Sequence, residues 1–366
     1  MNKKNETISI CKGIGIILMV MGHTCCPGML TAFIYMFHMP LFFIASGYFF
    51  SVKYVDDKST FIKKKVKGLY FPFVKWSLLF LVLHNVFFMV GLQNTSYGNM
   101  AGGVVRPYTY STMLDFVGKI LYSMGGYDPF VLGTFWFLRS LFVGSILFCL
   151  LYYLIHKFVT KNEIAVGIVI CLLAFAAGLK LAWHATTIPY WPQGGSRELY
   201  ALFYISAGFI FRRTRLNDHH KYDWALAICA FLFVAAYSQI HPTTLKYRPN
   251  LTLYLNTFLP GIIGWIMVYK ASHYISCNES RIKNLLVYIG NNTMPIFAFS
   301  LLSFKIVNAL KIFIYGLDPR MISCYPVIWV RNEWFWVVYT ICGVAVPLVV
   351  NAWYFRIKGY IIAKRS

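Results

Sequence analysis

The chain has 366 residues, of which 58% are apolar and only 13% are charged, and its formal net charge at pH 7 is +22. Because soluble domains carry about 25% charged residues, this composition excludes a disordered chain, a coiled coil, collagen and an ordinary soluble enzyme. In a soluble protein the positive charge would indicate nucleic-acid binding, but here it is expected to sort to one side of a bilayer. We therefore predict an all-α, polytopic membrane bundle with no nucleic-acid partner.

Ten stretches of the chain are apolar enough to form membrane-spanning helices, which need about 20 such residues. No internal repeat and no Gly/Ser-rich linker divides the sequence, so we predict one integral domain over residues 1–366. The first stretch carries Lys12 and His23 rather than the small residues of a cleavage site, and it is expected to remain as a helix. The predicted spans are residues 8–26, 29–50, 72–92, 134–156, 164–183, 198–211, 224–240, 251–270, 293–315 and 334–355.

Basic residues gather on one side of the predicted membrane. With the N-terminus inside, the inner loops hold most of the 34 lysine and arginine residues, and the outer loops hold few. Because lysine and arginine favour the cytoplasmic side, this bias predicts a protein of the cytoplasmic membrane with both termini inside. An even number of spans agrees with this orientation, since an odd number would place the basic C-terminal tail outside.

Ionisable residues inside the spans are the first candidates for a functional site, because each costs about 2.5–3.5 kcal/mol to insert. In the first span, Lys12 and His23 fall within about 20° of each other after three helical turns, so both lie on one face. They are about 16 Å apart along the helix axis, with the cation near the inner surface and the imidazole deep toward the outer one. Snorkelling of Lys12 and an interfacial position of His23 explain the same pattern without a function.

The second span and the loop after it carry the next candidates. His38 lies near the middle of its span and is followed by Pro40, so it either faces a cavity or packs as a hydrogen-bonded side chain in a kinked helix. The loop FIKKKVKGLYFPF (61–73) places several lysines at the inner surface. These lysines bind either lipid head groups or a polyphosphate ligand such as a nucleotide-bearing cofactor.

Four further candidates lie in later spans. Arg139 is in the outer part of the fourth span, and Arg197 and Glu198 open the sixth, where they form either a simple ion pair or a site for an acceptor. Lys305 lies inside the ninth span, about 18 Å from its start. The nine cysteines are scattered without metal-binding spacing, and no metal is expected.

Together these motifs resemble the acyltransferase-3 family of integral membrane acyltransferases. The likeness extends over the whole chain and is strongest to the branch that contains the fucose 4-O-acetylases and polysaccharide O-acetyltransferases. Lysines at 65 and 67 stand where the family often has Arg-x-Arg, and Ser300 stands where many relatives have histidine. The segments that carry the resemblance are KGIGIILMVMGH (12–23), similar to an Arg/Lys-x10-His motif, FHMPLFFIASGYFF (37–50), FIKKKVKGLYFPF (61–73), WFLRSLF (136–142) and IGNNTMPIF (289–297).

The resemblance implies an enzyme that transfers an acyl group, in particular acetyl from cytoplasmic acetyl-CoA, to a hydroxyl of a cell-surface glycan or lipid-linked sugar. It implies that Lys12, Lys65 and Lys67 bind the acyl-CoA, and that His23 is the general base. An acyl-histidine intermediate is the rival mechanism. The residues assigned to the acceptor, to the oxyanion or to the support of these groups are His38, Arg139, Arg197, Glu198 and Lys305.

A membrane transporter or flippase for a sugar-containing or anionic solute is the competing prediction. Buried ionisable residues also line substrate paths, but such proteins often contain repeated halves with paired broken helices, and the sequence shows no such symmetry. A bundle whose polar residues serve only packing and topology is the third possibility. The resemblance favours the acyltransferase over both.

Overall fold

The computed structural model describes residues 3–98, 106–127, 132–214, 216, 218, 222–331 and 333–363. The regular elements formed by these residues are all helical, and no β-strand is found among them. Eight helical segments in this part of the chain are long and apolar enough to cross a membrane. The prediction of an all-α, polytopic bundle is therefore confirmed.

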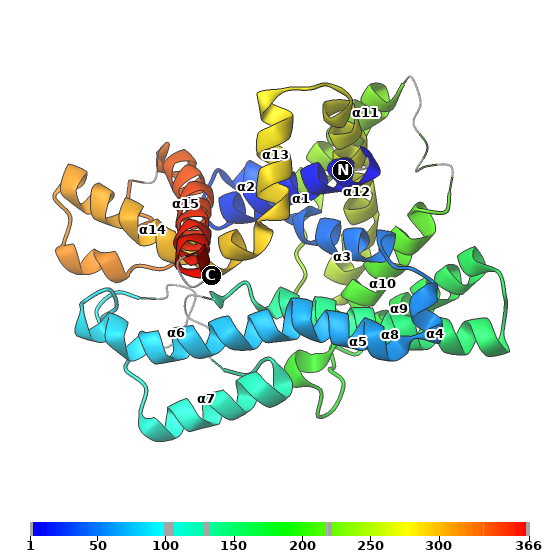
Figure 1. Ribbon diagram of the computed structural model, residues 1–366, viewed down its shortest axis with the longest axis horizontal. Helices are drawn as coiled ribbons and strands as arrows, with labels where there is room; N and C mark the ends of the chain where they lie inside the picture. The colour runs from blue at the N-terminus through cyan, green and yellow to red at the C-terminus, as the bar shows by residue number, and fades with distance from the viewer. Residues whose placement is uncertain are drawn as a thin grey trace.

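Helices follow one another through the whole described chain, as Figure 1 shows. One π-helical turn (Val66–Tyr70) joins α5 to α6, and two short 3-10 turns (Pro192–Gly194 and Pro319–Ser323) precede α10 and follow α14. The α-helices are α1 (Lys3–Gly22), α2 (Gly28–Tyr35), α3 (His38–Tyr48), α4 (Lys53–Asp56), α5 (Lys58–Lys65), α6 (Phe71–Met89), α7 (Tyr110–Ser123), α8 (Trp136–Phe158), α9 (Glu163–Trp183), α10 (Ser196–Phe211), α11 (Asp223–Ile240), α12 (Leu251–Cys277), α13 (Arg281–Asn291), α14 (Thr293–Tyr315) and α15 (Phe335–Ala363).

Eight of the ten predicted spans coincide with the eight long apolar segments. The other two, 8–26 and 198–211, form α1 and α10, and α10 has only 16 residues. The number of spans therefore stays a prediction. The predicted span 29–50 is divided into α2 and α3, and the one at 72–92 belongs to a helix that is continuous from residue 58 to residue 89.

The helix α3 lies at the centre of the bundle. It contacts α1, α8, α10 and α12, and nine of its 11 residues are buried. Its surface is apolar around nearly the whole circumference, which is the pattern of a helix enclosed by neighbours. His38 and Ser46 interrupt this surface, so α3 carries both of these polar groups into the interior of the protein.

Two glycines allow α3 to cross α10 at close range. A methyl group on Gly47 would collide with the carbonyl oxygen of Ile205, and one on Gly208 would collide with the carbonyl oxygen of Ile44. Small residues permit this approach of two helix backbones inside a membrane. The glycine of the Ser46-Gly47 pair is therefore required by the crossing.

Replacing Gly208 with alanine is expected to destabilise the protein by about 1–3 kcal/mol. The new methyl group would collide with backbone atoms of α3, which cannot move away by a change of rotamer. Thermal unfolding of the purified protein in detergent measures the effect. The matched control is Gly118→Ala in α7, where no atom lies within 4 Å of the added carbon. The control is expected to gain up to about 1 kcal/mol from the better helix propensity of alanine. Equal stability of Gly208→Ala and the wild type would contradict the crossing.

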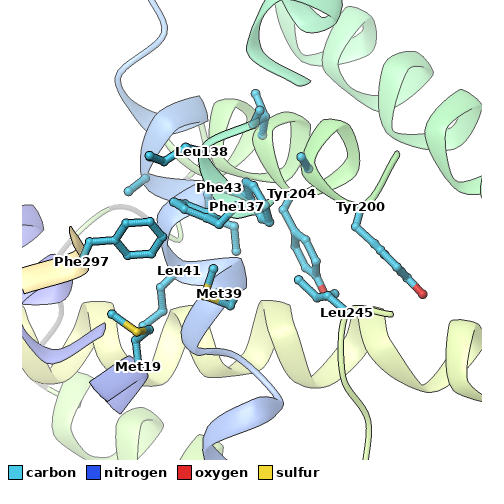
Figure 2. Packing of buried hydrophobic residues seen from close by; sticks show 14 of the residues in the cluster. Met19, Met39, Leu41, Phe43, Phe137, Leu138, Tyr200, Tyr204, Leu245 and Phe297 are labelled. Atoms are coloured by element: carbon cyan, nitrogen blue, oxygen red, sulfur yellow. The ribbon is translucent and has the colours of Figure 1, made fainter. Parts of the chain in front are cut away.

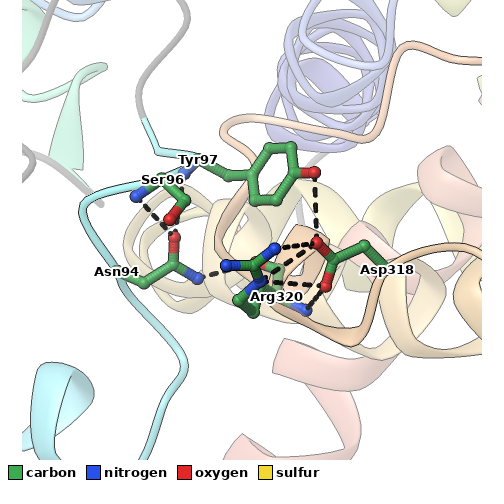
Figure 3. A network of polar contacts seen from close by, with 5 residues as sticks. All are labelled: Asn94, Ser96, Tyr97, Asp318 and Arg320. Atoms are coloured by element: carbon green, nitrogen blue, oxygen red, sulfur yellow. Dashed lines mark hydrogen bonds and ion pairs between the residues drawn. The ribbon is translucent and has the colours of Figure 1, made fainter.

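The loops after α6 and after α14 are tied together by the polar network in Figure 3. Asn94 donates its Nδ2 to the carbonyl oxygen of Arg320 at 2.7 Å, and its Oδ1 accepts from the backbone amides of Ser96 and Tyr97. The Tyr97 hydroxyl donates to Asp318, which also binds the Arg320 guanidinium. The hydrogen bonds from the Arg320 side chain lower the pKa of the Asp318 carboxyl. The two loops therefore close this end of the bundle as one unit.

Candidate functional site

Three cavities follow one another along the seam between α3 and α8. We call them the lysine cavity, the middle cavity and the histidine cavity, after the groups that line them. The lysine and middle cavities share four lining residues, and no acidic side chain is among the described residues that line any of the three. The shared residues are Ser46, Phe49, Leu69 and Leu141.

The lysine cavity has a volume of about 370 Å³ and contains two ammonium groups. Lys65 donates its Nζ to the Oγ of Ser46 at 3.0 Å, and Lys64 donates its Nζ to the hydroxyl of Tyr54 at 3.1 Å. Among the described residues neither lysine forms an ion pair, so both positive charges are available to a ligand. An anionic group that enters this cavity gains charge-assisted hydrogen bonds.

Helix periodicity decides which lysines face this cavity. The lining residues Phe61, Lys64, Lys65 and Gly68 repeat at intervals of three and four along one face. Lys67 is two residues after Lys65 and lies in the π-helical turn (Val66–Tyr70). It is exposed and lines none of the three cavities. Lys64, which the sequence pattern did not single out, lines the cavity beside Lys65.

The middle cavity has a volume of about 240 Å³ and lies between α1, α3, α8 and α14. Lys12 is the charged residue in its lining, and the remainder is mostly apolar, including Phe137 and Phe297. Ser46 borders this cavity as well as the lysine cavity, and so marks the junction between them. No hydrogen bond or ion pair connects Lys12 to another described residue, so its charge also faces the cavity without an acidic partner.

The histidine cavity has a volume of about 200 Å³ and brings together residues from distant parts of the sequence. His23 lies in the turn that ends α1, where its backbone amide donates to the carbonyl of Val20 at 3.0 Å. His38 opens α3, and Arg197 lies in the first turn of α10. The other lining residues are Met19, Tyr35, Met39, Thr134, Trp136, Thr244 and Leu245.

His38 is held in one orientation by the break between α2 and α3. Phe37 leaves the helical conformation with φ −142° and ψ −16°, so His38 becomes the first residue of the new helix. Its Nδ1 lies 2.8 Å from the carbonyl oxygen of Ile34. Because a carbonyl can only accept, Nδ1 carries the hydrogen and Nε2 keeps a lone pair. The break therefore creates an imidazole with a fixed tautomer in the lining of the cavity.

A septum of apolar side chains separates the middle cavity from the histidine cavity. Met19 and Met39 belong to the histidine cavity, whereas Phe137, Leu138 and Phe297 belong to the middle cavity. Figure 2 shows these five residues gathered around α3, and the ring centroids of Phe137 and Phe297 are 5.8 Å apart. The septum is about one helical turn thick, since Met39 and the middle-cavity residue Phe42 are three residues apart on α3.

A buried ion pair lies next to the histidine cavity. The Nη1 of Arg139 donates to the Oε1 of Glu198 at 2.8 Å, and the side chains are only 3% and 2% exposed. The same oxygen accepts from Ser140, and the Nε of Arg139 donates to the carbonyl of Ser123. The predicted Arg197–Glu198 pair is therefore replaced by Arg139–Glu198, because the two neighbours on α10 point in different directions.

A comparison with protein families identifies the family of this chain. A family model described as an acyltransferase domain matches residues 5–353. The chain belongs to the acyltransferase-3 family. The matched range includes every residue that lines the three cavities, and the sequence resemblance is confirmed at the level of the family. No curated protein and no solved structure gives a significant match.

Lys305 of the acyltransferase lies outside the three cavities. Its Nζ donates to the carbonyl oxygens of Ile322, Ser323 and Cys324 at distances of 2.8 to 3.0 Å. This buried ammonium therefore holds the segment that follows α14. The geometry gives Lys305 a structural position rather than the predicted contact with an acceptor or an oxyanion.

Two residues of the acyltransferase seam were missed by the sequence reasoning besides Lys64. Ser46 connects two cavities and accepts the hydrogen bond from Lys65, and its place in the second-helix signature was a usable signal. Trp136 lines the histidine cavity and lies under the guanidinium of Arg197, 4.1 Å from the ring centroid to the guanidinium carbon. This contact joins α8 to α10, and no local pattern reveals it.

Proposed function

We propose that the acyltransferase transfers acetyl from acetyl-CoA to a hydroxyl of a surface glycan or lipid-linked sugar. The observation that carries this proposal is the order of the cavities, which leads from Lys64 and Lys65, past Lys12, to the two histidines. A donor with phosphates at one end and a reactive thioester at the other fits that order. The basic loops are predicted to lie on the cytoplasmic side, which is the side where acetyl-CoA is available.

The donor phosphates are assigned to the lysine cavity. Lys64 and Lys65 bind phosphate as point charges. Each of them exchanges only a hydrogen bond to a neutral hydroxyl for the bond to phosphate. Lys12 continues the positive path into the middle cavity. The mostly apolar lining of that cavity suits the uncharged arm of the donor. Lys67 contributes from the exposed face of the same helix, through long-range attraction.

His23 is assigned the role of general base. It takes the proton from the acceptor hydroxyl while the hydroxyl oxygen attacks the thioester carbon. The carbon–sulfur bond then breaks, and the imidazolium returns its proton to the departing CoA sulfur. His38 presents the lone pair of Nε2 in the same cavity and accepts a hydrogen bond from a second hydroxyl of the acceptor sugar, which orients the sugar. The septum limits access of water to the thioester, which favours transfer over hydrolysis.

Replacing Lys65 with methionine is expected to raise the KM for acetyl-CoA by about tenfold or more, because a hydrogen bond to a charged group contributes about 1.5–3 kcal/mol. The Lys67→Met variant is expected to raise it by less than about fivefold, since an exposed charge contributes at most about 1 kcal/mol. Steady-state kinetics at varied acetyl-CoA concentration compare the two variants. A larger effect at Lys67 than at Lys65 would mean that the donor does not occupy the lysine cavity.

Mass spectrometry of surface glycans from cells with and without this chain tests the proposed function. A glycan species heavier by one acetyl group is expected only in cells that carry the chain, and its fragmentation names the acceptor. Identical spectra would overturn the assignment of a glycan acceptor. Saturable solute flux into vesicles in the absence of any acyl donor would instead establish transport.

A further inference from the structure

Arg197 brings a positive charge to the lining of the histidine cavity, and this charge points to the class of acceptor. Two guanidiniums, those of Arg139 and Arg197, lie beside one carboxylate, that of Glu198. Arg139 is paired with this carboxylate, whereas Arg197 forms no ion pair with any described residue. A partly buried charge without a direct counter-ion is less favourable than a paired one, so a bound anion would stabilise the arrangement.

The known partners of Arg197 are all neutral. Its Nε donates to the carbonyl oxygen of Leu245 at 3.1 Å, and its Nη1 donates to the Oε1 of Gln193 at 3.4 Å. Its guanidinium lies over the ring of Trp136. These contacts hold the guanidinium in place, at the wall of the cavity that contains His23 and His38, but they leave its charge uncompensated.

A second observation also indicates a ligand in this cavity. Thr134 lines the cavity, is only 3% exposed, and its hydroxyl has no hydrogen-bond partner among the described residues. A buried hydroxyl without a partner costs free energy that a polar ligand can recover. The cavity therefore contains a fixed cation and an unused hydroxyl, together with two imidazoles.

We propose that the acceptor carries an anionic group, a carboxylate or a phosphate, that binds Arg197 while its reacting hydroxyl faces the histidines. An acidic sugar supplies the carboxylate, and a lipid-linked sugar supplies the phosphate. A guanidinium can bind either group through two parallel hydrogen bonds. The inference rests on the proposed function, since it names the acceptor class of the same site.

Thermal unfolding of the purified full-length protein in detergent tests this proposal without any turnover. The probes are sodium glucuronate, glucose 1-phosphate and the neutral methyl glucoside. Glucuronate or glucose 1-phosphate is expected to raise the Tm of the wild type by about 2 °C or more at saturation, and methyl glucoside is expected to leave it unchanged. Which of the two anions gives the larger shift distinguishes the acidic sugar from the lipid-linked one.

Three variants locate the anion. Arg197→Gln is expected to lose the shift, Arg197→Lys to keep part of it, and Arg320→Gln, which removes an exposed arginine elsewhere, to keep all of it. A shift that survives in Arg197→Gln but disappears in Lys65→Met would place the anion in the lysine cavity and overturn the proposal. No shift with either anion, or an equal shift with methyl glucoside, would overturn it as well.

The identity of the sugar that becomes acetylated tests this inference separately from the proposed function. We expect the acetylated sugar either to carry a carboxylate or to be linked directly to a phosphate. Acetylation of a neutral sugar with no anionic group on it or next to it would overturn the inference and leave the proposed function intact. If no acetylated glycan forms while the Arg197-dependent shift persists, the anion site stands and the proposed function fails.

Discussion

Replacing His23 with alanine is expected to lower kcat for acetyl transfer by about 10²–10⁴-fold, because a positioned general base contributes an acceleration of that size. The KM for acetyl-CoA is expected to change little, since the lysines proposed to bind the donor phosphates lie beyond the septum. Release of CoA and formation of acetyl ester, measured together on the purified protein, report the loss. The matched control is His184→Ala, which removes an exposed histidine that lines none of the three cavities.

The same experiment with His38 decides between the two imidazoles. Removal of His38 is expected to lower kcat less than removal of His23, because in the proposed mechanism His38 orients the acceptor through a second hydroxyl and does not take the proton of the reacting one. Full activity of His23→Ala together with an inactive His38→Ala would reassign the base to His38, whose tautomer is fixed by Ile34. Full activity of both variants would remove the histidine cavity from the mechanism.

Replacing Arg139 with methionine is expected to destabilise the acyltransferase by about 3–5 kcal/mol, because the carboxylate of Glu198 then stays buried without its partner. Thermal or chemical unfolding in detergent measures the change. The double variant Arg139→Met with Glu198→Gln is expected to recover part of the loss, since it removes the buried negative charge as well.

An exposed pair supplies the matched control for this prediction. Lys119 and Asp115 on α7 also form an ion pair, but their side chains are 41% and 53% exposed. Replacing Lys119 with methionine is expected to change the stability by no more than about 1 kcal/mol. Equal effects at Lys119 and Arg139 would show that burial of the Arg139–Glu198 pair contributes nothing.

The fold class could be predicted because its signals are local. Long apolar runs and a helical period identify most spans without knowledge of the rest of the chain. They also predict Lys12 and His23 on one helix face, but α1 ends at Gly22, and His23 lies in the turn that follows. The amphipathic helices α7 and α13 contain no uniformly apolar run, so the predicted spans do not include them. The assignment of Lys67 rested on the family resemblance, although helical periodicity alone favours Lys64.

The rest of the site depends on contacts between distant segments. The break at Phe37 occurs where this side chain packs against Gly264 of α12, so nothing near His38 reveals its final orientation. The pairing of Arg139 with Glu198 joins α8 to α10 in the same way. Lys305 resembled a site residue because it is a charge inside a span, and only the carbonyl groups around it show that it supports a loop.

The septum between the middle and histidine cavities has an electrical consequence. If the three cavities were joined by water, protons and small ions would cross the bilayer down the membrane potential, at about 2.3 kcal/mol per charge for each 100 mV. A barrier of methionine and phenylalanine side chains repels hydrated ions, yet these side chains are flexible enough to let a neutral thioester through. In the proposed function, the same five residues keep ions from crossing the membrane while the acyl group passes between the two cavities.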